Sequence, residues 1–535
     1  MAGFDAVFVG SGINSLAAAA LLAKEGWRCC VLERNDWLGG ALKTVDGLTA
    51  PGFRHEVFAS WHPLWVGSPA YAELKPELDR LGLEYLNTDL PTASAFPDGS
   101  SAHLSTDGAA NVAELGEAWQ RQFDEFMGAA DIAFGVLGSE LWSGQGISLA
   151  RKAYRQFGRR GLVEFAGHSL LSARDWLHDT FPDERVHGLL APWVLHTGLG
   201  PDQAMSGFMT QVIACALQLG GMPVPKGGGV ELVDALAAIV RDAGGELRTE
   251  ADVDRIVVSE GAATGVRLAD GETVSATRAV LACVTPTQLY GRLLSNGDVP
   301  THVREEGLRY RYGRGEMQIH IAMSRTPRWR GDERLARTPL VHITPGLDGV
   351  SRAVNEAERG LLPAESTIAL GQPMTVDPSR APEGSWVLWV QLQELPPKPK
   401  GDAAGEIDTG DGTWTEELRE AYADRIVERI GRHVENLAEA TVARVVLSPA
   451  DIEAANPNWV GGDIYAGSCA LDQTLVFRPR PATPGHGTPV DRLFQIGAST
   501  HPGPGLGAGS GYLVAKQLTK PALVRRMLAK VPGLP

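Results

Sequence analysis

Residues 5–33 read DAVFVGSGINSLAAAALLAKEGWRCCVLE, and the rest of the chain can be interpreted from this segment outward. The apolar residues 5–9 predict a short buried strand, and the alanine- and leucine-rich residues 16–23 predict a helix. A second apolar strand, residues 29–32, ends at an acid, Glu33. The order of strand, glycine-rich turn, helix, strand and acid is typical of a dinucleotide-binding βαβ unit.

The turn between the first strand and the helix has the residue types that such a unit needs. Gly10 permits the tight turn, and Gly12 lets a pyrophosphate approach the first N–H groups of the helix, where the dipole favours negative charge. Glu33 can accept hydrogen bonds from ribose hydroxyls and would repel a 2′-phosphate, whereas Arg34 would tolerate one. Ser15 occupies the third position of the fingerprint, where glycine is usual. The alternative is an ordinary strand–turn–helix whose glycines serve only the turn.

Length, composition and charge narrow the class of protein. The 535 residues suffice for two or three domains, and 44% apolar with 21% charged residues is ordinary for a globular protein. A net charge of -15 argues against nucleic acid as a partner. Five cysteines without a C-x-x-C pair predict reduced core residues in a cytoplasmic protein, with no disulfide frame and no metal site. With no charged leader and no run of about 18 apolar residues, we expect neither secretion nor a membrane span.

Residues 111–220 have helical periodicity and few strand signals. We expect amphipathic helices over residues 115–141 and 162–177. Residues 208–219 are apolar nearly all round, which predicts a helix buried beside a hydrophobic cavity or, as an equal alternative, in plain domain core.

A basic segment lies inside this helical region. It interleaves positive and apolar side chains: Arg151, Lys152, Tyr154, Arg155, Phe157, Arg159, Arg160 and Leu162. Such a surface can lie on an anionic membrane, which predicts a peripheral membrane contact. A solvated helix face is the commoner alternative.

The second half of the chain is expected to return to the nucleotide-binding unit and to leave it again. The glycines at 227–229 predict an entry turn for a helix over residues 231–243. Antiparallel and return strands are expected after that helix, at residues 246–249, 255–258, 264–268, 273–275 and 279–282. Beyond them we expect strands at 317–323 and 386–392, a helix at 417–435, and surface loops at 327–363 and 396–412.

A second glycine-rich turn lies near the end of the chain. Residues 491–496 predict a strand, residues 497–511 contain six glycines, and a helix is expected from residue 512. Glycines between a strand and a helix N-terminus favour close approach of the backbone to a ligand. A disordered linker is the alternative, and the flanking apolar segments argue against it.

Together these features resemble the FAD-dependent phytoene desaturase-like family of oxidoreductases. The resemblance runs nearly end to end, and its motifs are Gly10-Ser11-Gly12 with Glu33, Gly39-Gly40, Pro51-Gly52-Phe53, His62-Pro63, residues 225–229, Asn456-Pro457-Asn458, Gly461-Gly462-Asp463-Ile464 and His501-Pro502-Gly503-Pro504-Gly505. The motifs after residue 455 favour a less characterised animal branch of the family over the carotenoid desaturases.

The resemblance implies an α/β fold with two parts. One is a glutathione reductase-type, Rossmann-like FAD-binding domain, and the other is a discontinuous α+β substrate domain. The FAD-binding domain would comprise residues 1–90, 223–290 and 451–535. The substrate domain would comprise residues 91–222 and 291–450.

The resemblance also implies where FAD binds. The first turn would hold the pyrophosphate and Glu33 the adenosine ribose, while Val253 would meet the adenine through its backbone. Residues 39–42 would pass beside the flavin, and the last glycine turn would cradle the ribityl chain and the pyrimidine edge. The implied FAD-binding residues are Gly10, Gly12, Ile13, Asn14, Ser15, Glu33, Arg34, Gly39, Gly40, Ala41, Leu42, Val253, Gly497, Gly505, Leu506 and Gly507.

Catalytic residues are not evident in the sequence. It contains no Gly-x-Ser-x-Gly elbow, no His-Glu-x-x-His and no metal-spaced set of cysteines and histidines. His62 and His501 are the ionisable residues of the family motifs that would face the flavin. Each is a weak candidate for a general base, and a structural hydrogen-bonding role is the commoner alternative.

The leading hypothesis is therefore an FAD-dependent oxidoreductase acting on a hydrophobic small molecule, an isoprenoid or polyene, by dehydrogenation or redox-neutral isomerisation. A flavin supplies hydride chemistry, so a hydrophobic tunnel with little charged machinery suffices. The alternatives are a flavin amine oxidase acting on a small amine and a flavin-containing binding protein without turnover. The sequence makes no prediction of the oligomeric state.

Overall fold

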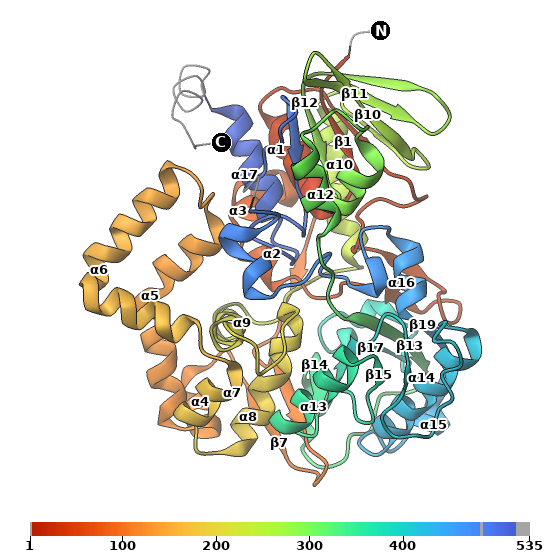
Figure 1. The fold of residues 1–535 in the computed structure, drawn as a ribbon. Helices are drawn as coiled ribbons and strands as arrows, with labels where there is room; N and C mark the ends of the chain where they lie inside the picture. The colour runs from red at the N-terminus through yellow and green to blue at the C-terminus, as the bar shows by residue number, and fades with distance from the viewer. Residues whose placement is uncertain (1–2, 482–484, 521–535) are drawn as a thin grey trace.

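The computed structural model describes residues 3–481 and 485–520, and Figure 1 shows the arrangement of its elements. Two seven-stranded sheets organise this part of the chain. The first has the order β10-β11-β12-β1-β2-β9, with β20 beside β12. Its strands are β1 (Phe4–Val9), β2 (Cys29–Leu32), β9 (Glu246–Arg248), β10 (Val253–Ser259), β11 (Ala262–Leu268), β12 (Thr273–Ala282) and β20 (Leu493–Gln495).

The predicted βαβ unit forms the centre of the first sheet. Strands β1 and β2 are parallel, and α1 (Ile13–Lys24) connects them. Helix α1 is buried along nearly its whole length, because it packs against the sheet and lies beside α10 (Gly229–Asp242) and α17 (Gly509–Thr519) (Figure 1). Its alanines permit this close packing on all sides. The helix-entry turn predicted before α10 is confirmed, since Gly228 is the N-cap of that helix.

One strand of this sheet differs from the prediction. Residues 273–275 and 279–282 were expected to be two strands, and they form the single strand β12. The first half of β12 pairs antiparallel with β11, and its second half pairs parallel with β1 and β20. The change of partner keeps the backbone hydrogen-bonded along the whole strand, so the chain has no reason to turn between the two halves.

The second sheet has the order β19-β13-β17-β16-β14-β6-β7. Its strands are β6 (Thr92–Ala95), β7 (Ser101–Leu104), β13 (Gly315–Met323), β14 (Leu340–Ile343), β16 (Ile368–Gly371), β17 (Trp386–Leu395) and β19 (Thr441–Leu447). Helix α14 (Glu416–Gly431) covers one face, where Tyr422 and Ile426 join the apolar core of the sheet. This helix ends four residues before the predicted end at residue 435.

The prediction of a surface loop over residues 327–363 was wrong. This segment contains the buried strand β14 and the helix α13 (Leu347–Glu358). Strand β14 has only four residues, LVHI, and lies between β6 and β16. A strand this short, flanked by prolines, carries too little periodicity to be detected.

The helical region between the sheets' strands contains α4 (Gly108–Leu115), α5 (Glu117–Gly138), α6 (Gly144–Ser169), α7 (Ala173–Thr180), α8 (Glu184–Leu190), the 3-10 helix η1 (Ala191–Thr197) and α9 (Ser206–Gly220). The single helix predicted over residues 162–177 was wrong. Its first part belongs to α6, and α7 starts after Ser172, whose side chain accepts a hydrogen bond from the Asp175 N–H. This capping bond favours a new helix start over a continuous helix.

The remaining α-helices and strands lie around the two sheets. They are β3 (Thr44–Asp46), β4 (Arg54–Glu56), α2 (Pro63–Val66), α3 (Pro69–Arg80), β5 (Tyr85–Leu86), β8 (Val224–Pro225), α11 (Pro286–Gln288), α12 (Thr301–Leu308), β15 (Leu361–Leu362), β18 (Gly401–Asp402), α15 (Leu437–Ala440) and α16 (Pro449–Ala455). Residues 482–484 and 521–535 of the predicted domain segment 451–535 lie outside the described residues.

Candidate functional site

A cavity of about 360 Å³ extends from the carboxyl ends of β1 and β2 to strand β17 of the second sheet. All the residues that the resemblance assigned to FAD line this cavity except Ser15, Leu42 and Gly507. The cavity has two chemically different ends. The end at β1 and β2 is called the nucleotide end here, and the end at β17 is called the substrate end.

Glu33 is the central acid of the nucleotide end. It lies at the end of β2, is only 6% exposed, and one of its carboxylate oxygens accepts the N–H of Ser11 at 3.0 Å and the Ser11 hydroxyl at 2.7 Å. The Ser11 hydroxyl in turn accepts the Gly39 N–H at 3.1 Å. Both predicted glycine segments are thereby tied to one carboxylate, which still has lone pairs for a further donor such as a hydroxyl.

The two helices that begin at this end lack side-chain caps. Gly12 is the N-cap of α1 and Ala508 is the N-cap of α17, and neither position makes a side-chain capping bond. The first N–H groups of an uncapped helix favour an anion such as a phosphate. The carboxylate at the end of β2 and this uncapped N-terminus of α1 are suited to a ribose hydroxyl and a pyrophosphate, so the residues present fit a dinucleotide.

The glycines of this end are required by close backbone contacts. The N–H of Gly511 donates to the Asn14 side-chain oxygen at 3.0 Å, and a Cβ at position 511 would lie 2.0 Å from the backbone oxygen of Asn14. A Cβ on Gly40 would lie 3.1 Å from Cα of Gly12. These positions bring α1, α17 and the segment after β2 together around the cavity.

Ser15, Leu42 and Gly507 lie behind the cavity wall. Ser15 and Leu42 are buried at 0% and 1% exposure, and Leu42 belongs to the core between α1 and α10. Gly507 lies against the backbone of Leu64. Direct contact with a cofactor stays a prediction for these three residues, as it does for the assigned residues that line the cavity.

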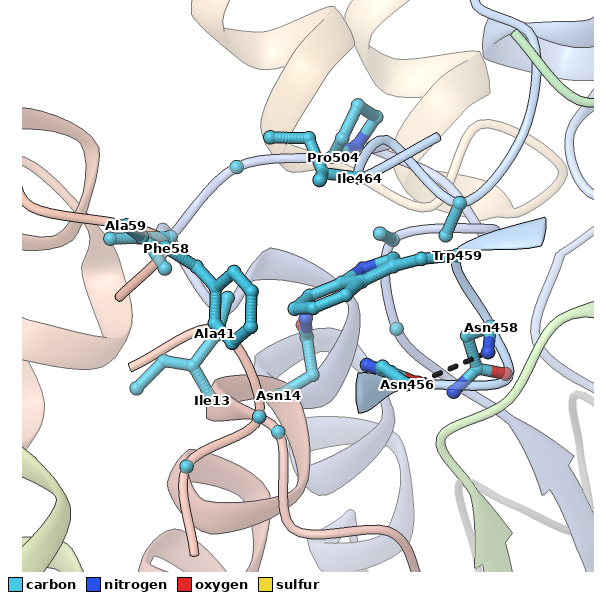
Figure 2. Close-up of a pocket in the computed structure, with 18 of the residues that line it drawn as sticks. Ile13, Asn14, Ala41, Phe58, Ala59, Asn456, Asn458, Trp459, Ile464 and Pro504 are labelled. Carbon is cyan, nitrogen blue, oxygen red and sulfur yellow. Dashed lines mark hydrogen bonds between the residues drawn. The ribbon is translucent and has the colours of Figure 1, made fainter. Parts of the chain in front are cut away.

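Aromatic and aliphatic side chains dominate the substrate end. The rings of Phe58 and Trp459 point toward one another (Figure 2), with centroids 4.8 Å apart in an edge-to-face arrangement. Trp61 and Trp389 form a second edge-to-face pair at 6.4 Å. Other apolar lining residues are Trp193, Ile213, Leu217, Met222 and Leu340.

Helix α9 contributes to this wall through Ile213, Ala216 and Leu217. The sequence left open whether the helix lies beside a cavity or in plain core. Both alternatives apply to α9, because one side of the helix lines the cavity and the opposite side packs in the core with α7 and η1. A helix between a core and a cavity is apolar nearly all round for that reason.

The formally charged side chains of the described cavity wall gather at the nucleotide end. They are Glu33, Arg34, Asp252 and Arg292. At the substrate end the polar lining residues are uncharged or, like His196, titratable. Burial lowers the pKa of His196 to about 3, so this ring is neutral at physiological pH.

The two predicted histidines do not line the cavity. His62 is the N-cap of α2, and its Nδ1 lies 2.9 Å from the hydroxyl of Tyr85. Burial lowers the pKa of His62 to about 3 and that of His501 to about 4. Both rings are neutral and enclosed, which favours the structural alternative.

Sequence reasoning missed several residues of the substrate end. Gln391 and Gln393 lie on β17, where a polar residue at every second position of an apolar strand is a detectable signal. His196 lies in η1, and no motif marks it. The motif at Asn456 and Asn458 was noted without a role, and both residues line the cavity (Figure 2).

Two further observations concern the described residues as a whole. Within residues 3–481 and 485–520, no group of three or more His, Cys, Asp or Glu side chains is arranged to hold a metal ion. None of the helices in the same ranges is both long enough and apolar enough to cross a bilayer.

Comparisons with known proteins place the chain among flavoproteins. The family model described as flavin containing amine oxidoreductase matches residues 16–513. The chain is 27% identical to "Pyridine nucleotide-disulfide oxidoreductase domain-containing protein 2" of Mus musculus, over 95% of this chain and 92% of that protein. It is 28% identical to "Phytoene dehydrogenase" of Streptomyces griseus, over 97% of this chain and 96% of that protein.

A solved structure shows the same fold. Wild-type putrescine oxidase bound to putrescine superimposes with a TM-score of 0.61 at 17% identity, over 96% of this chain and 98% of that chain. The predicted α/β flavoprotein fold and the resemblance to phytoene desaturase-like oxidoreductases are thus confirmed. The predicted cofactor FAD is confirmed by the family, which is flavin-containing. The chain belongs to the family of flavin-containing amine oxidoreductases.

Proposed function

We propose that this flavin oxidoreductase acts on a hydrophobic small molecule of isoprenoid or polyene type, by dehydrogenation or by redox-neutral isomerisation. One observation carries the proposal: the substrate end of the cavity is walled by aromatic and aliphatic side chains, and no charged side chain of the described residues lines it. Such a wall stabilises an apolar substrate by removing its surface from water. The similarity to "Phytoene dehydrogenase" of Streptomyces griseus supports the same substrate class.

The nucleotide end would hold FAD as follows. Glu33 would accept the ribose hydroxyls, the uncapped start of α1 would bind the pyrophosphate, and the backbone of Val253 would meet the adenine. The segments 39–42 and 505–507, with Gly497, would lie along the flavin. When bound, FAD supplies the acceptor for a hydride. The protein's own contribution is orientation of the substrate and exclusion of water by the aromatic walls.

The two-domain division follows from the same proposal. Residues 1–90, 223–290 and 451–535 would form the FAD-binding domain, and residues 91–222 and 291–450 the substrate domain. The distribution of strands supports this division, because the first sheet draws its strands from the former set and the second sheet from the latter.

A second candidate is oxidation of an amine. The family description favours it, as do the two edge-to-face aromatic pairs, which can surround an amine. The absence of a carboxylate from the described wall of the substrate end argues against a strongly cationic substrate, because a buried ammonium needs a counter-charge. Binding without turnover is the third alternative.

Anaerobic titration of the purified holoenzyme separates these functions. Loss of the visible absorbance of oxidised flavin on addition of isoprenoids or polyenes is the result expected for dehydrogenation. An isomerised product by chromatography without that loss is the result expected for redox-neutral isomerisation. Loss of this absorbance with amines alone would establish the second candidate. If isoprenoids bind without any change in the oxidation state of the flavin, and chromatography shows no isomerised product, the third alternative of binding without turnover would be supported.

The hairpin of α5 and α6 is the proposed membrane contact. These helices pack together at the edge of the molecule (Figure 1) and expose large apolar side chains, including Val163 at 69% and Tyr154 at 58%. Among the basic residues of α6, Lys152 and Arg160 form ion pairs, whereas Arg151, Arg155 and Arg159 form none with a described residue. Exposed apolar and unpaired basic groups together favour an anionic lipid surface.

Co-sedimentation with vesicles tests this contact. We expect binding to vesicles of phosphatidylcholine with phosphatidylglycerol, and loss of binding when Arg151, Arg155 and Arg159 are changed to Glu. A matched control changes Arg325, Arg328 and Arg330 on the second sheet's surface to Glu, with the same change in net charge. If both triple variants lost vesicle binding equally, the effect of charge would be non-specific, and the basic face of α6 would be an ordinary solvated helix face.

A further inference from the structure

The second sheet has two faces of opposite character. On β17, Leu388, Val390 and Leu392 point into the apolar core beneath α14. The alternate residues Gln391 and Gln393 therefore project from the other face, because successive side chains of a strand point to opposite sides. This second face is turned toward the cavity, which Gln391 and Gln393 line.

The strands beside β17 continue this polar face. Gln391 is opposite Gln318 of β13 on one side and opposite Ala369 of β16 on the other, and Ala369 is opposite His342 of β14. Residues directly opposite one another in a sheet share a face. Gln318, Gln391 and His342 thus lie in one row across this face, with Ala369 between the last two. Gln391 and Gln393 bring uncharged polar groups to an otherwise apolar end of the cavity, which a purely hydrocarbon substrate does not require.

The two glutamine amides are held in a defined orientation. The Gln391 NH2 group donates to a carboxyl oxygen of Glu316 at 2.6 Å, and the Gln393 NH2 group donates to the Tyr465 hydroxyl at 2.8 Å. The Tyr465 hydroxyl donates onward to the Leu195 carbonyl at 2.8 Å. With both NH2 groups engaged, each glutamine has its side-chain carbonyl oxygen left, and neither oxygen has a hydrogen-bond partner among the described residues.

Beside these two oxygens, no charged side chain of the described residues lines the cavity. Glu316 is completely buried, and its burial, reinforced by nearby Asp463, raises its pKa well above the usual range, which favours the uncharged carboxyl. His196 lies at the same end, with Nε2 2.9 Å from Nε2 of His342, and both rings are neutral. The substrate end therefore offers hydrogen-bond acceptors without a counter-ion for a cation.

We infer that the substrate is a hydrophobic molecule bearing an uncharged hydrogen-bond donor, a hydroxyl group, which lies against the side-chain oxygens of Gln391 and Gln393. This inference rests on the proposed function and narrows its substrate class from hydrocarbons to hydrophobic alcohols. Two acceptors that line the cavity and have no hydrogen-bond partner within the described residues disfavour a ligand that cannot donate to them, and this gives the site its selectivity.

Equilibrium binding to the holoenzyme tests the inference without requiring turnover. The probes are geraniol, geranyl methyl ether, geranylamine and geranic acid, which share one isoprenoid skeleton and differ only in the terminal group. Binding is measured by quenching of tryptophan fluorescence, because Trp61, Trp193 and Trp389 line this end, and by isothermal titration calorimetry. At pH 7 geraniol should bind at least about tenfold more tightly than its methyl ether, which accepts but cannot donate.

Variants locate the effect. In Gln391→Leu and in Gln393→Leu, the preference for geraniol over the ether should fall to less than about threefold, because Leu has a similar size and no acceptor. Gln318→Leu is the matched control: Gln318 is buried on the same face but does not line the cavity, so it should keep the full preference. Flavin content and circular dichroism verify that each variant is folded, and either glutamine variant alone suffices for the test.

Several outcomes would overturn the inference. They are equal binding of geraniol and its ether, tightest binding of geranylamine or geranic acid, an unchanged preference in both glutamine variants, and no binding of any probe. The proposed function fails separately. If no isoprenoid reduces the flavin or is isomerised while the preference for geraniol persists, recognition of the hydroxyl stands and the oxidoreductase function is rejected. If isoprenoids reduce the flavin but geraniol is not preferred over its ether, the oxidoreductase function stands and recognition of the hydroxyl is rejected.

Discussion

The two ends of the cavity are built from different chemical groups, backbone groups at one end and side chains at the other. The nucleotide end is built around glycine turns, two helix N-termini and the carboxylate of Glu33, and it draws mainly on backbone groups. The substrate end consists of side chains from η1, α9 and β17, far apart in sequence. A backbone site tolerates few residue types, whereas a side-chain site can change its ligand by single substitutions. This comparison predicts large, general effects at the first end and smaller, selective effects at the second.

The largest effect is expected at Gly511. A Cβ there would lie 2.0 Å from the Asn14 backbone oxygen, so Gly511→Ala must separate α17 from α1. We expect a loss of about 3 kcal/mol or more of the free energy of unfolding, with loss of bound FAD. Urea denaturation and the flavin content of the purified protein measure both. Gly487→Ala is the control, since nothing lies within 4 Å of a Cβ at that position. A stable Gly511→Ala variant with full flavin content would contradict the backbone account.

A smaller loss is expected from Glu33→Gln. The substitution removes the charge that the Ser11 N–H and hydroxyl share, and weakens any bond to a ribose hydroxyl. Hydrogen bonds to a charged group contribute about 1.5–3 kcal/mol, so the Kd of FAD should rise roughly tenfold to a hundredfold. Titration of apoprotein with FAD, followed by flavin fluorescence, measures the change. Glu246→Gln on the neighbouring strand, in an exposed ion pair, should bind FAD like the wild type. Equal affinity in both variants would exclude Glu33 from the cofactor site.

The pH dependence of stability should change in Glu316→Gln. The pKa of Glu316 is higher in the folded than in the unfolded protein, so its contribution is complete below the unfolded pKa and is lost as pH rises toward the folded value. Wild-type stability should therefore fall relative to the variant by up to about 1.4 kcal/mol per pH unit above roughly pH 4.5. Urea midpoints from pH 5 to 8 provide the measurement. The variant keeps the charged neighbours of Glu316, which are Asp463, Glu394 and Arg314. If the stabilities of the two proteins changed with pH in parallel, folding would not raise the pKa of Glu316.

The smallest effect on catalysis is expected at His62. Its pKa of about 3 keeps the ring neutral, and it faces Tyr85 behind the cavity wall. His62→Gln should leave the pH profile of flavin reduction between pH 6 and 9 unchanged, at a cost of about 1–2 kcal/mol in stability. Stopped-flow reduction across this range tests it. If a limb of the wild-type profile vanished in the variant, His62 would be a proton carrier and the structural assignment would be wrong.

Much of the nucleotide end could be predicted from the sequence. Its signals are local: the turn from Gly10 to Ser15 lies between two apolar strands, and Glu33 follows within one helix and one strand. Glycines mark close backbone approach directly, because few other residues fit. The helices and strands flanking both glycine turns were predicted for the same reason, with boundaries displaced by a few residues.

The substrate end could not be predicted in the same way. His196 comes from a 3-10 helix, Gln391 from a central strand, and β14 from a segment that the sequence favours as a loop. The packing of the second sheet brings them together, and no local pattern records which face of that sheet meets the cavity. Burial also raises the pKa of Glu316, and the sequence neighbours of Glu316 give no sign of this shift.

The sequence by itself determined the βαβ unit of residues 4–33 and the family, because the steric and electrostatic demands of a phosphate beside a helix N-terminus restrict residues within a short stretch. Only the tertiary structure decided what the cavity can select. Selectivity depends on which distant side chains share one wall, how their hydrogen bonds are already used, and which charges burial removes.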